Sequence, residues 1–296
     1  MSTIDTGPST NGRGSEAWSG SWTHFGVDRP SAGYCRVTFD HPPINTITAA
    51  TVAELAELVG LLEQDPDLNV VVFASANPDF YLAHYDTEHD PGKTLGLGAG
   101  PTGMHAWLDL LVRLSRAPAV SIAAIRGRVR GAGSELVLAC DLRFASRENA
   151  LLGQFEVGTG LVPGGGPAVR LPRLVGRGRA LEILLVADDL DGPRAEQYGY
   201  VNRAIADDRL DAEVEAIAAR LARFDDEAIA RTKAYVDQVT LPADAEFPPA
   251  LADFFELSGR PRQQAQFARL EALGLNTDSD LERSLGRRVV ESLPDA

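Results

Sequence analysis

Residues 121–146, SIAAIRGRVRGAGSELVLACDLRFAS, decide the fold. The apolar run AVSIAAI (119–125) is typical of a buried strand. A group of small residues follows it, and helical spacing of apolar residues resumes in GAGSELVLAC (131–140). LRFAS (142–146) then predicts a further strand. A strand, a helix and another strand in this order indicate an α/β fold.

The same alternation extends to both sides of this stretch. The pattern predicts a strand at 34–39, a helix over 52–62, a strand at 70–74, a helix over 105–116, a glycine-rich turn at 160–167 and a helix over 178–187. After about Phe224 every segment has helical spacing, interrupted by proline and glycine. We therefore expect a core domain over 25–224 and a helical C-terminal region over 225–296.

Two segments have no apolar period. Residues 1–24 are rich in Ser, Thr and Gly and cannot bury enough apolar area to offset their chain entropy, which predicts a disordered tail whose first 22 residues are dispensable. Residues 88–103 are rich in Gly and Pro, which predicts a long mobile loop of the kind that borders sites. Because the tail lacks the apolar core of a signal peptide, we expect a cytoplasmic protein.

The composition of the chain excludes several classes of partner. With 28 basic against 42 acidic residues, the net charge is −14, so the surface repels phosphate backbones and anionic lipid. We therefore expect neither nucleic acid nor a membrane as a partner. The two cysteines, Cys35 and Cys140, are too few for a disulfide framework, and we expect both to be buried.

Three other patterns carry no site. Gly92-Lys93-Thr94 lacks the glycine that a phosphate-binding loop needs farther upstream. The GxGxxG spacing at 98–103 lacks the apolar strand that precedes a dinucleotide-binding turn. The histidines are not spaced as paired metal ligands, so we expect no metal site.

The junction at residues 130–136, RGAGSEL, has features that could support chemistry. The first N–H groups of a helix have no partner within it, and the helix dipole favours negative charge there, so a ligand oxygen can bind. Small residues let the ligand approach. Glu135 lies in the first turn, where a carboxylate could act in catalysis or merely complement the dipole.

Four stretches together resemble the enoyl-CoA hydratase, or crotonase, superfamily. Residues 121–146 are similar to its central signature, and GQFEVGTGLVPGGGPAVRLPRLVGRGRALEILL (153–185) is similar to the segment that comes next in the family. FDHPPINTITAATVAELAELV (39–59) resembles the first strand and helix of the family, and DGPRAEQYGYVNRAI (191–205) resembles a later helix and strand. The four occur in the family's order, and the resemblance extends from about Tyr34 to Thr240.

The resemblance implies a spiral of ββα units with a C-terminal helical region that builds trimers, often paired into hexamers. It also implies an acyl-CoA substrate whose enolate is held by two backbone N–H groups, an oxyanion hole. Those donors correspond to Ala132, in the family's GGG position, and Tyr85, in the SAGAD-like stretch. The flanking residues expected to contact substrate or coenzyme A are Ala83, His84, Asp86, Gly131 and Gly133.

Both glutamates that hold the attacking water in the family's hydratases have counterparts here, Glu135 and Glu156. Two carboxylates facing one water supply a base for its proton and an acid for the α-carbon. The resemblance thus implies an enoyl-CoA hydratase that uses no metal and no redox cofactor. Coenzyme A enters only as part of the substrate.

The chain departs from the family pattern in the first oxyanion segment, where His84 and Tyr85 replace a glycine and a small residue. The ring of Tyr85 must occupy space near the thioester or acyl group. His84 could act as a new acid or base, or its side chain could point away from the site and bond to a loop. Alternatives on the same fold are an acyl-CoA isomerase, a hydrolase, a C–C lyase or a non-catalytic acyl-CoA-binding subunit.

Overall fold

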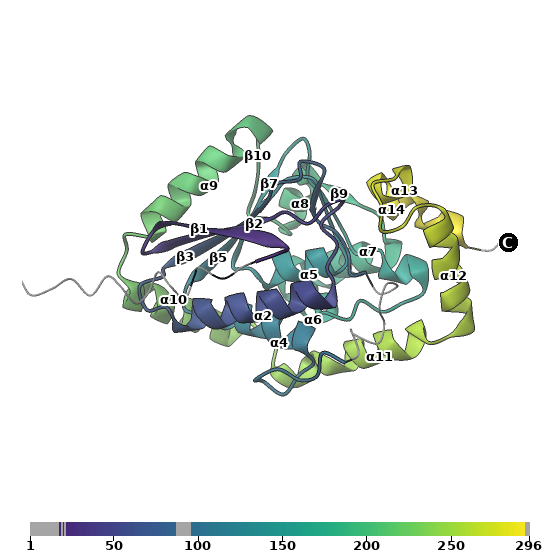
Figure 1. The fold of residues 1–296 in the computed structure, drawn as a ribbon, viewed down its shortest axis with the longest axis horizontal. Coiled ribbons are helices and arrows are strands. Elements are labelled where there is room, and N and C mark those ends of the chain that lie inside the picture. The colour runs from purple at the N-terminus through teal and green to yellow at the C-terminus, as the bar shows by residue number, and fades with distance from the viewer. Residues whose placement is uncertain (1–17, 19, 21, 87–95, 294–296) are drawn as a thin grey trace, which may run out of the picture.

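Among the residues that the computed structural model describes (Trp18, Gly20, 22–86 and 96–293), six strands form the central sheet of the protein (Figure 1). Across the sheet their order is β1 (Phe25–Ser31), β2 (Tyr34–Phe39), β3 (Val70–Ser75), β5 (Val120–Ile125), β7 (Leu142–Ser146) and β10 (Arg203–Ile205). β1 and β2 are antiparallel, and each later pair of neighbours is parallel. Parallel neighbours need crossover connections, which the intervening helices provide.

A second, smaller sheet leads directly to the strand–helix junction. Its strands within the described part of the chain are β4 (Phe80–Leu82), β6 (Arg128–Arg130), β8 (Leu151–Gly153) and β9 (Leu190–Asp191). β6 pairs in parallel with both β4 and β8. Because β6 ends immediately before α5 (Ala132–Ala139), this sheet fixes the position of the first turn of α5.

Helices cover both faces of the six-stranded sheet (Figure 1). α9 (Asp207–Leu221) packs on one face, where Val70 and Val72 of β3 contribute to its apolar cluster. Val71 and Phe73 point to the other face and join the larger core with α2 (Ala49–Gln64), α4 (Ala106–Arg116) and α5. Both faces of β3 are therefore buried, as its continuous apolar run predicts.

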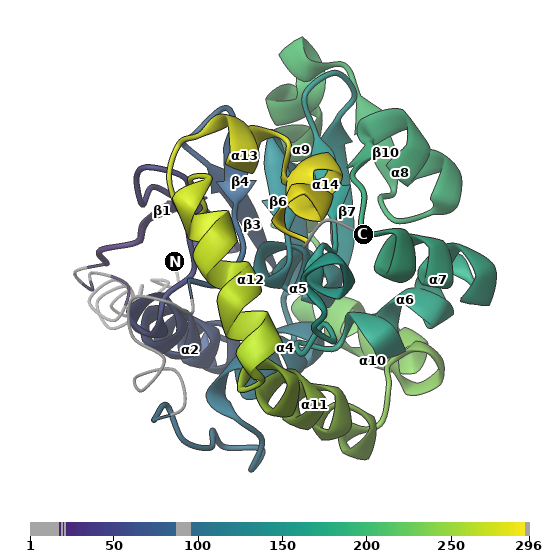
Figure 2. The ribbon, with the colours of Figure 1, turned by 90° about the vertical axis from the view of Figure 1, so that its right-hand side faces the viewer.

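The later helices follow the sheets and then return across the molecule. The intermediate ones are a 3-10 helix (Glu156–Thr159), α6 (Pro167–Val175), α7 (Arg177–Val186) and α8 (Gly192–Tyr198). After Phe224 the described elements are α10 (Asp226–Thr240), α11 (Pro248–Ser258), α12 (Pro261–Ala272), α13 (Asp280–Arg283), α14 (Leu285–Arg288) and two 3-10 turns (Asp244–Glu246 and Val289–Ser292). Figure 2 shows α11, α12 and α14 crossing the side of the molecule on which α5 lies.

The observed elements agree closely with the predicted ones. The helix predicted over 52–62 begins three residues earlier, where the Thr48 side chain caps it, and Asp65 follows its last turn. The predicted mobile loop at 88–103 lies partly outside the described residues, and its described part, residues 96–103, forms turns. Ala99 and His105 form a β-bridge at the end of that part, so this portion is an ordered turn.

The described part of the N-terminal segment packs on the core, in contrast to the tail expected over 1–24. Trp18 is 8% exposed, and its indole N–H donates to Asp65 Oδ2 at 3.0 Å. The Arg29 guanidinium lies 4.6 Å from the centre of the Trp18 ring, and Trp22 stacks on Phe25. These two aromatic rings supply apolar area that the average composition of the segment does not reveal. The expectation of disorder is therefore wrong for Trp18 and Trp22.

We expect Trp18→Ala to lower the free energy of unfolding by roughly 3 kcal/mol, because a nearly buried aromatic ring and its contacts are lost. Trp18→Phe keeps most of the packing but removes the donor to Asp65, so its effect should be about 1 kcal/mol. Urea denaturation of the full chain measures both values. If Trp18→Ala unfolds at the wild-type urea concentration, the contacts of Trp18 do not stabilise the fold.

Candidate active site

The junction of β6 and α5 has the backbone geometry of a ligand site. Gly131 is the N-cap of α5 and has a φ of +48°, a conformation that favours glycine. A Cβ on Gly131 would lie 3.0 Å from Glu156 Oε1 and 3.1 Å from His84 Cβ, so the glycine lets these side chains approach. Ala132 is the first residue of α5, where a backbone N–H has no partner within the helix. Such an N–H can bind a ligand oxygen.

Glu135 is buried in the first turn of α5, with 4% of its surface exposed. Its Oε1 accepts from the backbone N–H of Gly165 at 2.6 Å, and its Oε2 accepts from Trp107 Nε1 at 2.7 Å. These donors lie on other segments, 30 and 28 residues away in sequence. The side chain is thus held by the tertiary structure, and complementation of the dipole of α5 does not account for its position.

Gly165 is adapted to this contact. A Cβ added to Gly165 would overlap Oε2 of Glu135 and would lie 2.6 Å from Nε1 of Trp107. Only glycine lets the backbone N–H come this close to the carboxylate. The glycine-rich turn predicted at 160–167 therefore has a specific use, which is to hold Glu135.

Glu156 begins the 3-10 helix and is also buried. With its NH₂ turned toward Glu156, the Gln154 amide donates to Oε2 at 3.0 Å and to Oε1 at 3.1 Å. The amide oxygen of Gln154 then accepts from Ser134 Oγ at 2.8 Å, and Ser134 also hydrogen-bonds to the Tyr200 hydroxyl. A chain of hydrogen bonds from the core therefore orients this carboxyl group.

The two carboxyl groups have different environments. Burial raises the pKa of Glu135, while the N–H donors of Trp107 and Gly165 favour its ionised form and oppose the rise. Burial and, after it, the negative charge of Glu135 raise the pKa of Glu156 to about 8. Burial and like charge thus favour one proton on the pair, whose two carboxyl groups have different donors. Such a difference separates an acid from a base.

Tyr85 lies opposite α5 at the end of the segment after β4. The carbonyl of His84 accepts from Ile47 N–H at 3.1 Å, and Asp86 N–H donates to Ile47 O at 2.8 Å. Because N–H and C=O point in opposite directions across a trans peptide, the His84 contact turns the Tyr85 N–H away from Ile47. The ring of Tyr85 packs edge-on against Trp107, with centroids 6.5 Å apart.

His84 is 4% exposed, and both of its ring nitrogens face oxygen atoms of the protein. Nε2 lies 2.7 Å from Glu282 Oε1, and Nδ1 lies 3.2 Å from the carbonyl oxygen of Tyr85. Of the two roles open to His84 from the sequence, bonding to another segment describes these contacts. The segment is α13, near the C-terminus.

These groups surround one cavity of about 80 Å³. The residues that line it from the core include His84, Tyr85, Trp107, Ala132, Glu135 and Glu156. Apolar and aromatic side chains of the C-terminal region, among them Leu251, Phe254, Phe255, Phe267 and Leu275, complete the wall. The cavity is thus apolar over much of its surface, with two carboxyl groups at one place, as in an enzyme pocket.

The structure brings the proposed catalytic pair and the proposed oxyanion residues together at this cavity. The remaining predicted contact residues, Ala83, Asp86, Gly131 and Gly133, are not among its lining residues in the described chain. Ala83 packs with Ile44 and Phe80, and a Cβ on Gly133 would overlap the carbonyl oxygen of Leu82. Gly133 therefore serves the close packing of α5 on β4.

Sequence patterns missed several residues of the site. Trp107 belongs to a helix whose apolar spacing indicates only packing, and Gln154 resembles any polar residue after a strand. The C-terminal lining residues lie beyond Thr240, where the resemblance read from the sequence ends. No motif indicates that Phe254 and Phe267 line the same cavity as His84, or that Glu282 bonds to its ring, because these residues lie far apart in the chain.

Comparison with known proteins decides the family. The family model "Enoyl-CoA hydratase/isomerase" matches residues 29–256. The chain belongs to that family. This confirms the expected crotonase fold and explains the alternation of strands and helices in the core.

The chain is also similar to individual proteins and solved structures. The chain is 41% identical to a putative enoyl-CoA hydratase from Streptomyces avermitilis, with a TM-score of 0.88 over 94% of this chain and 99% of the other. It is 27% identical to Pseudomonas aeruginosa DspI, with a TM-score of 0.67 over 79% of this chain and 94% of the other. The mouse enoyl-CoA hydratase domain-containing protein 2, mitochondrial, is 33% identical over 179 residues, which are 60% of this chain. The match spans 59% of the mouse protein's length.

Two further features are absent from the described residues. None of the helices they form is both long and apolar enough to cross a membrane. Within the same residues no group of three or more His, Cys, Asp or Glu side chains is arranged to hold a metal ion.

We expect Gly165→Ala to displace the Glu135 carboxylate, because the added methyl group would overlap Oε2. Loss of the aligned carboxylate should lower the rate of any reaction that uses it by roughly 10²-fold or more. Steady-state kinetics measure the change, and circular dichroism checks the fold. Gly178→Ala is the control, because a Cβ there meets nothing within 4 Å. Equal activity of both variants would contradict the role of Gly165.

Proposed function

We propose that the protein is an enoyl-CoA hydratase, which adds water across the double bond of a 2-enoyl-CoA thioester or catalyses the reverse reaction. The observation that supports this proposal is the presence of two buried carboxyl groups, Glu135 and Glu156, in the wall of one cavity. Addition of water requires one group to accept a proton and one to donate a proton.

The difference between the carboxyl groups assigns their roles. Glu135, whose ionised form is favoured by two N–H donors, accepts a proton from water as the oxygen bonds to the β-carbon. Glu156, whose pKa is raised to about 8, donates its proton to the α-carbon. The proton gained by Glu135 and the proton lost by Glu156 balance over the reaction.

The backbone N–H groups of Tyr85 and Ala132 are the proposed donors to the thioester oxygen. Negative charge develops on that oxygen as the enolate forms, and fixed donors stabilise it more than they stabilise the substrate. The position of Ala132 at the start of α5 adds the favourable end of the helix dipole. The proposed reaction needs neither a metal nor a redox cofactor.

A second candidate function forms the same enolate but differs in the step after it. The ring of Tyr85 lines the cavity and packs on Trp107, next to Glu135. A ring in that place can displace the water that would attack the β-carbon. The outcome is then isomerisation or C–C cleavage of another acyl-CoA, or its hydrolysis by a water that attacks the thioester carbonyl instead. A binding subunit without turnover is the remaining alternative.

We expect Glu135→Gln and Glu156→Gln each to lower the rate of hydration by roughly 10²- to 10⁴-fold, because each keeps its shape and loses a proton acceptor or donor. Loss of absorbance of the conjugated thioester in crotonyl-CoA, or in a longer enoyl-CoA, measures the rate. Ala132→Pro removes a backbone donor and should lower hydration by roughly 10²- to 10³-fold.

Exchange of the α-proton of a saturated acyl-CoA with solvent separates formation of the enolate from addition of water, because the exchange needs the enolate but no added water. We expect exchange to survive in at least one glutamate variant and to fail in Ala132→Pro. Wild-type hydration rates in both glutamate variants would refute the two-carboxylate mechanism. A wild-type protein that hydrates no enoyl-CoA but exchanges the α-proton would favour the second candidate.

We also propose that the protein is a homotrimer or a pair of trimers. Three apolar side chains of α10 face solvent, with Tyr235 at 74% and Val239 at 81% exposed beside Val236. None of the residues of α10 is buried within the chain, so this helix has an apolar surface without an intramolecular partner.

Light scattering should give the mass of three or six copies of the 31.7-kDa chain. Val239→Glu places a charge on the apolar surface of α10 and should shift the assembly toward smaller species. A wild-type protein that stays a single chain at every concentration would rule out the trimer.

A further inference from the structure

The contacts of His84 specify where its protons lie. The Tyr85 carbonyl oxygen is only an acceptor, so Nδ1 at 3.2 Å from it must carry a proton to form a hydrogen bond. Glu282 Oε1, at 2.7 Å from Nε2, also accepts from the backbone N–H of Asn276 at 2.8 Å. Because both nitrogens face acceptors, the contacts fit an imidazolium ion paired with a carboxylate.

The surrounding charges agree with this assignment. Burial lowers the pKa of His84, but the Glu282 carboxylate and the hydrogen bonds outweigh burial and raise that pKa above its ordinary value. The charged groups around the ring are Glu282 on α13, Arg130 on β6 and Glu156 in the 3-10 helix. Arg130 opposes the positive charge of His84, so the carboxylate of Glu282 is needed to hold it.

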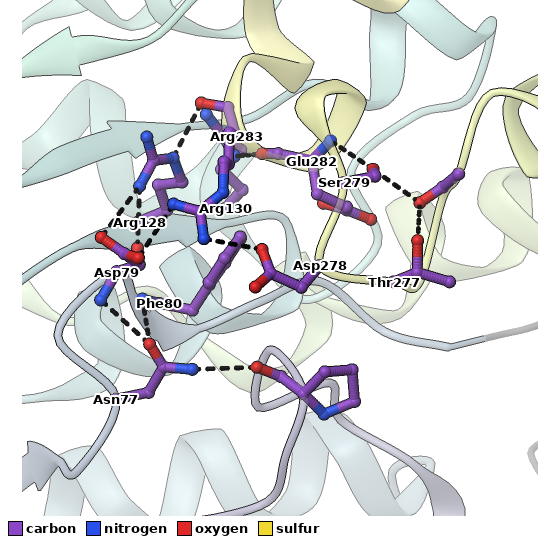
Figure 3. A network of polar contacts seen from close by, with 12 residues as sticks. Asn77, Asp79, Phe80, Arg128, Arg130, Thr277, Asp278, Ser279, Glu282 and Arg283 are labelled. Carbon is purple, nitrogen blue, oxygen red and sulfur yellow. Dashed lines mark hydrogen bonds and ion pairs between the residues drawn. The ribbon is translucent and has the colours of Figure 1, made fainter.

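Hydrogen bonds to the backbone of α13 fix the position of Glu282 (Figure 3). Arg130 Nη1 donates to the carbonyl oxygen of Glu282 at 2.6 Å, and the same guanidinium forms a paired contact with Asp189. Arg128 Nε donates to the carbonyl oxygen of Arg283 at 2.8 Å. The two arginines project from β6, the strand that leads into α5, and so they fix α13 relative to the junction.

The side chain of Arg283 also joins α13 to the segment before β4. Its Nη1 lies 2.8 Å from Asp79 Oδ2, and its Nη2 lies 2.8 Å from Asp278 Oδ1. Asp79 immediately precedes β4, the strand that leads to His84. The short helix α13 is therefore attached to both strands that end at the proposed oxyanion donors.

We propose that His84 and Glu282 form a buried ion pair that joins the C-terminal region to the oxyanion segment, and that both are positioning residues for Tyr85. The pair holds the Tyr85 carbonyl from one side while Ile47 holds the His84 carbonyl from the other. Both peptide groups that flank Tyr85 are then fixed. The positioning role rests on the proposed function, in which the Tyr85 N–H binds the thioester oxygen.

Glu282→Gln tests the pair because it removes the charge and keeps the shape. The oxygen of the introduced amide can still accept from Asn276 N–H and from Nε2–H of His84. With the carboxylate gone, burial and Arg130 lower the pKa of His84, and the neutral ring keeps its proton on Nε2. Nδ1 then has no proton to donate to the Tyr85 carbonyl.

The charge state of His84 is measured by ¹⁵N NMR of histidine-labelled protein, with the signal assigned by His84→Gln. At about pH 7.5, one unit above the ordinary histidine pKa, we expect wild-type His84 to carry both protons. In Glu282→Gln we expect a neutral ring at the same pH. The wild-type measurement does not depend on Glu282→Gln, and a neutral His84 in the wild type would overturn the ion pair.

The positioning role is measured by kinetics as a function of pH. At about pH 7.5 we expect Glu282→Gln to lower kcat roughly 10- to 100-fold with little change in KM, because a donor is misplaced while substrate contacts remain. As the pH falls through the lowered pKa of His84, the ring regains its second proton, and the ratio of variant to wild-type kcat should rise. Asp280→Asn, an exposed carboxylate on the same helix, should match the wild type.

Two kinetic results would overturn the positioning role. One is a wild-type kcat in Glu282→Gln at every pH, and the other is a loss of kcat that does not depend on pH, which would reflect a structural contact alone. A wild-type protein without hydratase activity would refute the proposed function. In that case the NMR measurement still decides the ion pair.

Discussion

The burial of two carboxyl groups at one cavity is the constraint on which the rest of the site depends. Within the described chain, neither Glu135 nor Glu156 forms an ion pair with a lysine or arginine, so backbone and side-chain donors must stabilise them. α4 supplies the indole of Trp107, the glycine-rich turn supplies the N–H of Gly165, and the segment after β8 supplies Gln154. The strands and helices bring these donors from distant parts of the sequence to one place.

Much of the fold could be predicted because its signals are local. The apolar run of β3 and the helical spacing of α2 each reflect residues that contact their own neighbours in sequence. The junction at Gly131 is predictable for the same reason, since small residues between a strand and a helix form one continuous pattern. The resemblance to a family then singles out Glu135 and Glu156 as candidates.

The missing parts of the site depend on contacts across the chain. Nothing around Trp107 indicates a partner at Glu135, and the glycine at 165 shows its purpose only when the carboxylate that fills its space is known. The prediction for the N-terminal segment failed at Trp18 and Trp22 for another reason, because each of these rings has its own contacts with the core. Composition averages over such residues, whereas packing depends on each one.

The attachment of α13 has a consequence for the order in which the protein is made. His84 and Glu282 are 198 residues apart, so the ribosome completes both sheets long before it releases the partner of His84. Until α11 and α12 follow the sheets, the cavity lacks the wall that these helices form, and its apolar surface and carboxyl groups face water. A nascent chain whose sheets have already formed therefore still has an open site. Synthesis of α11, α12 and α13 encloses that site.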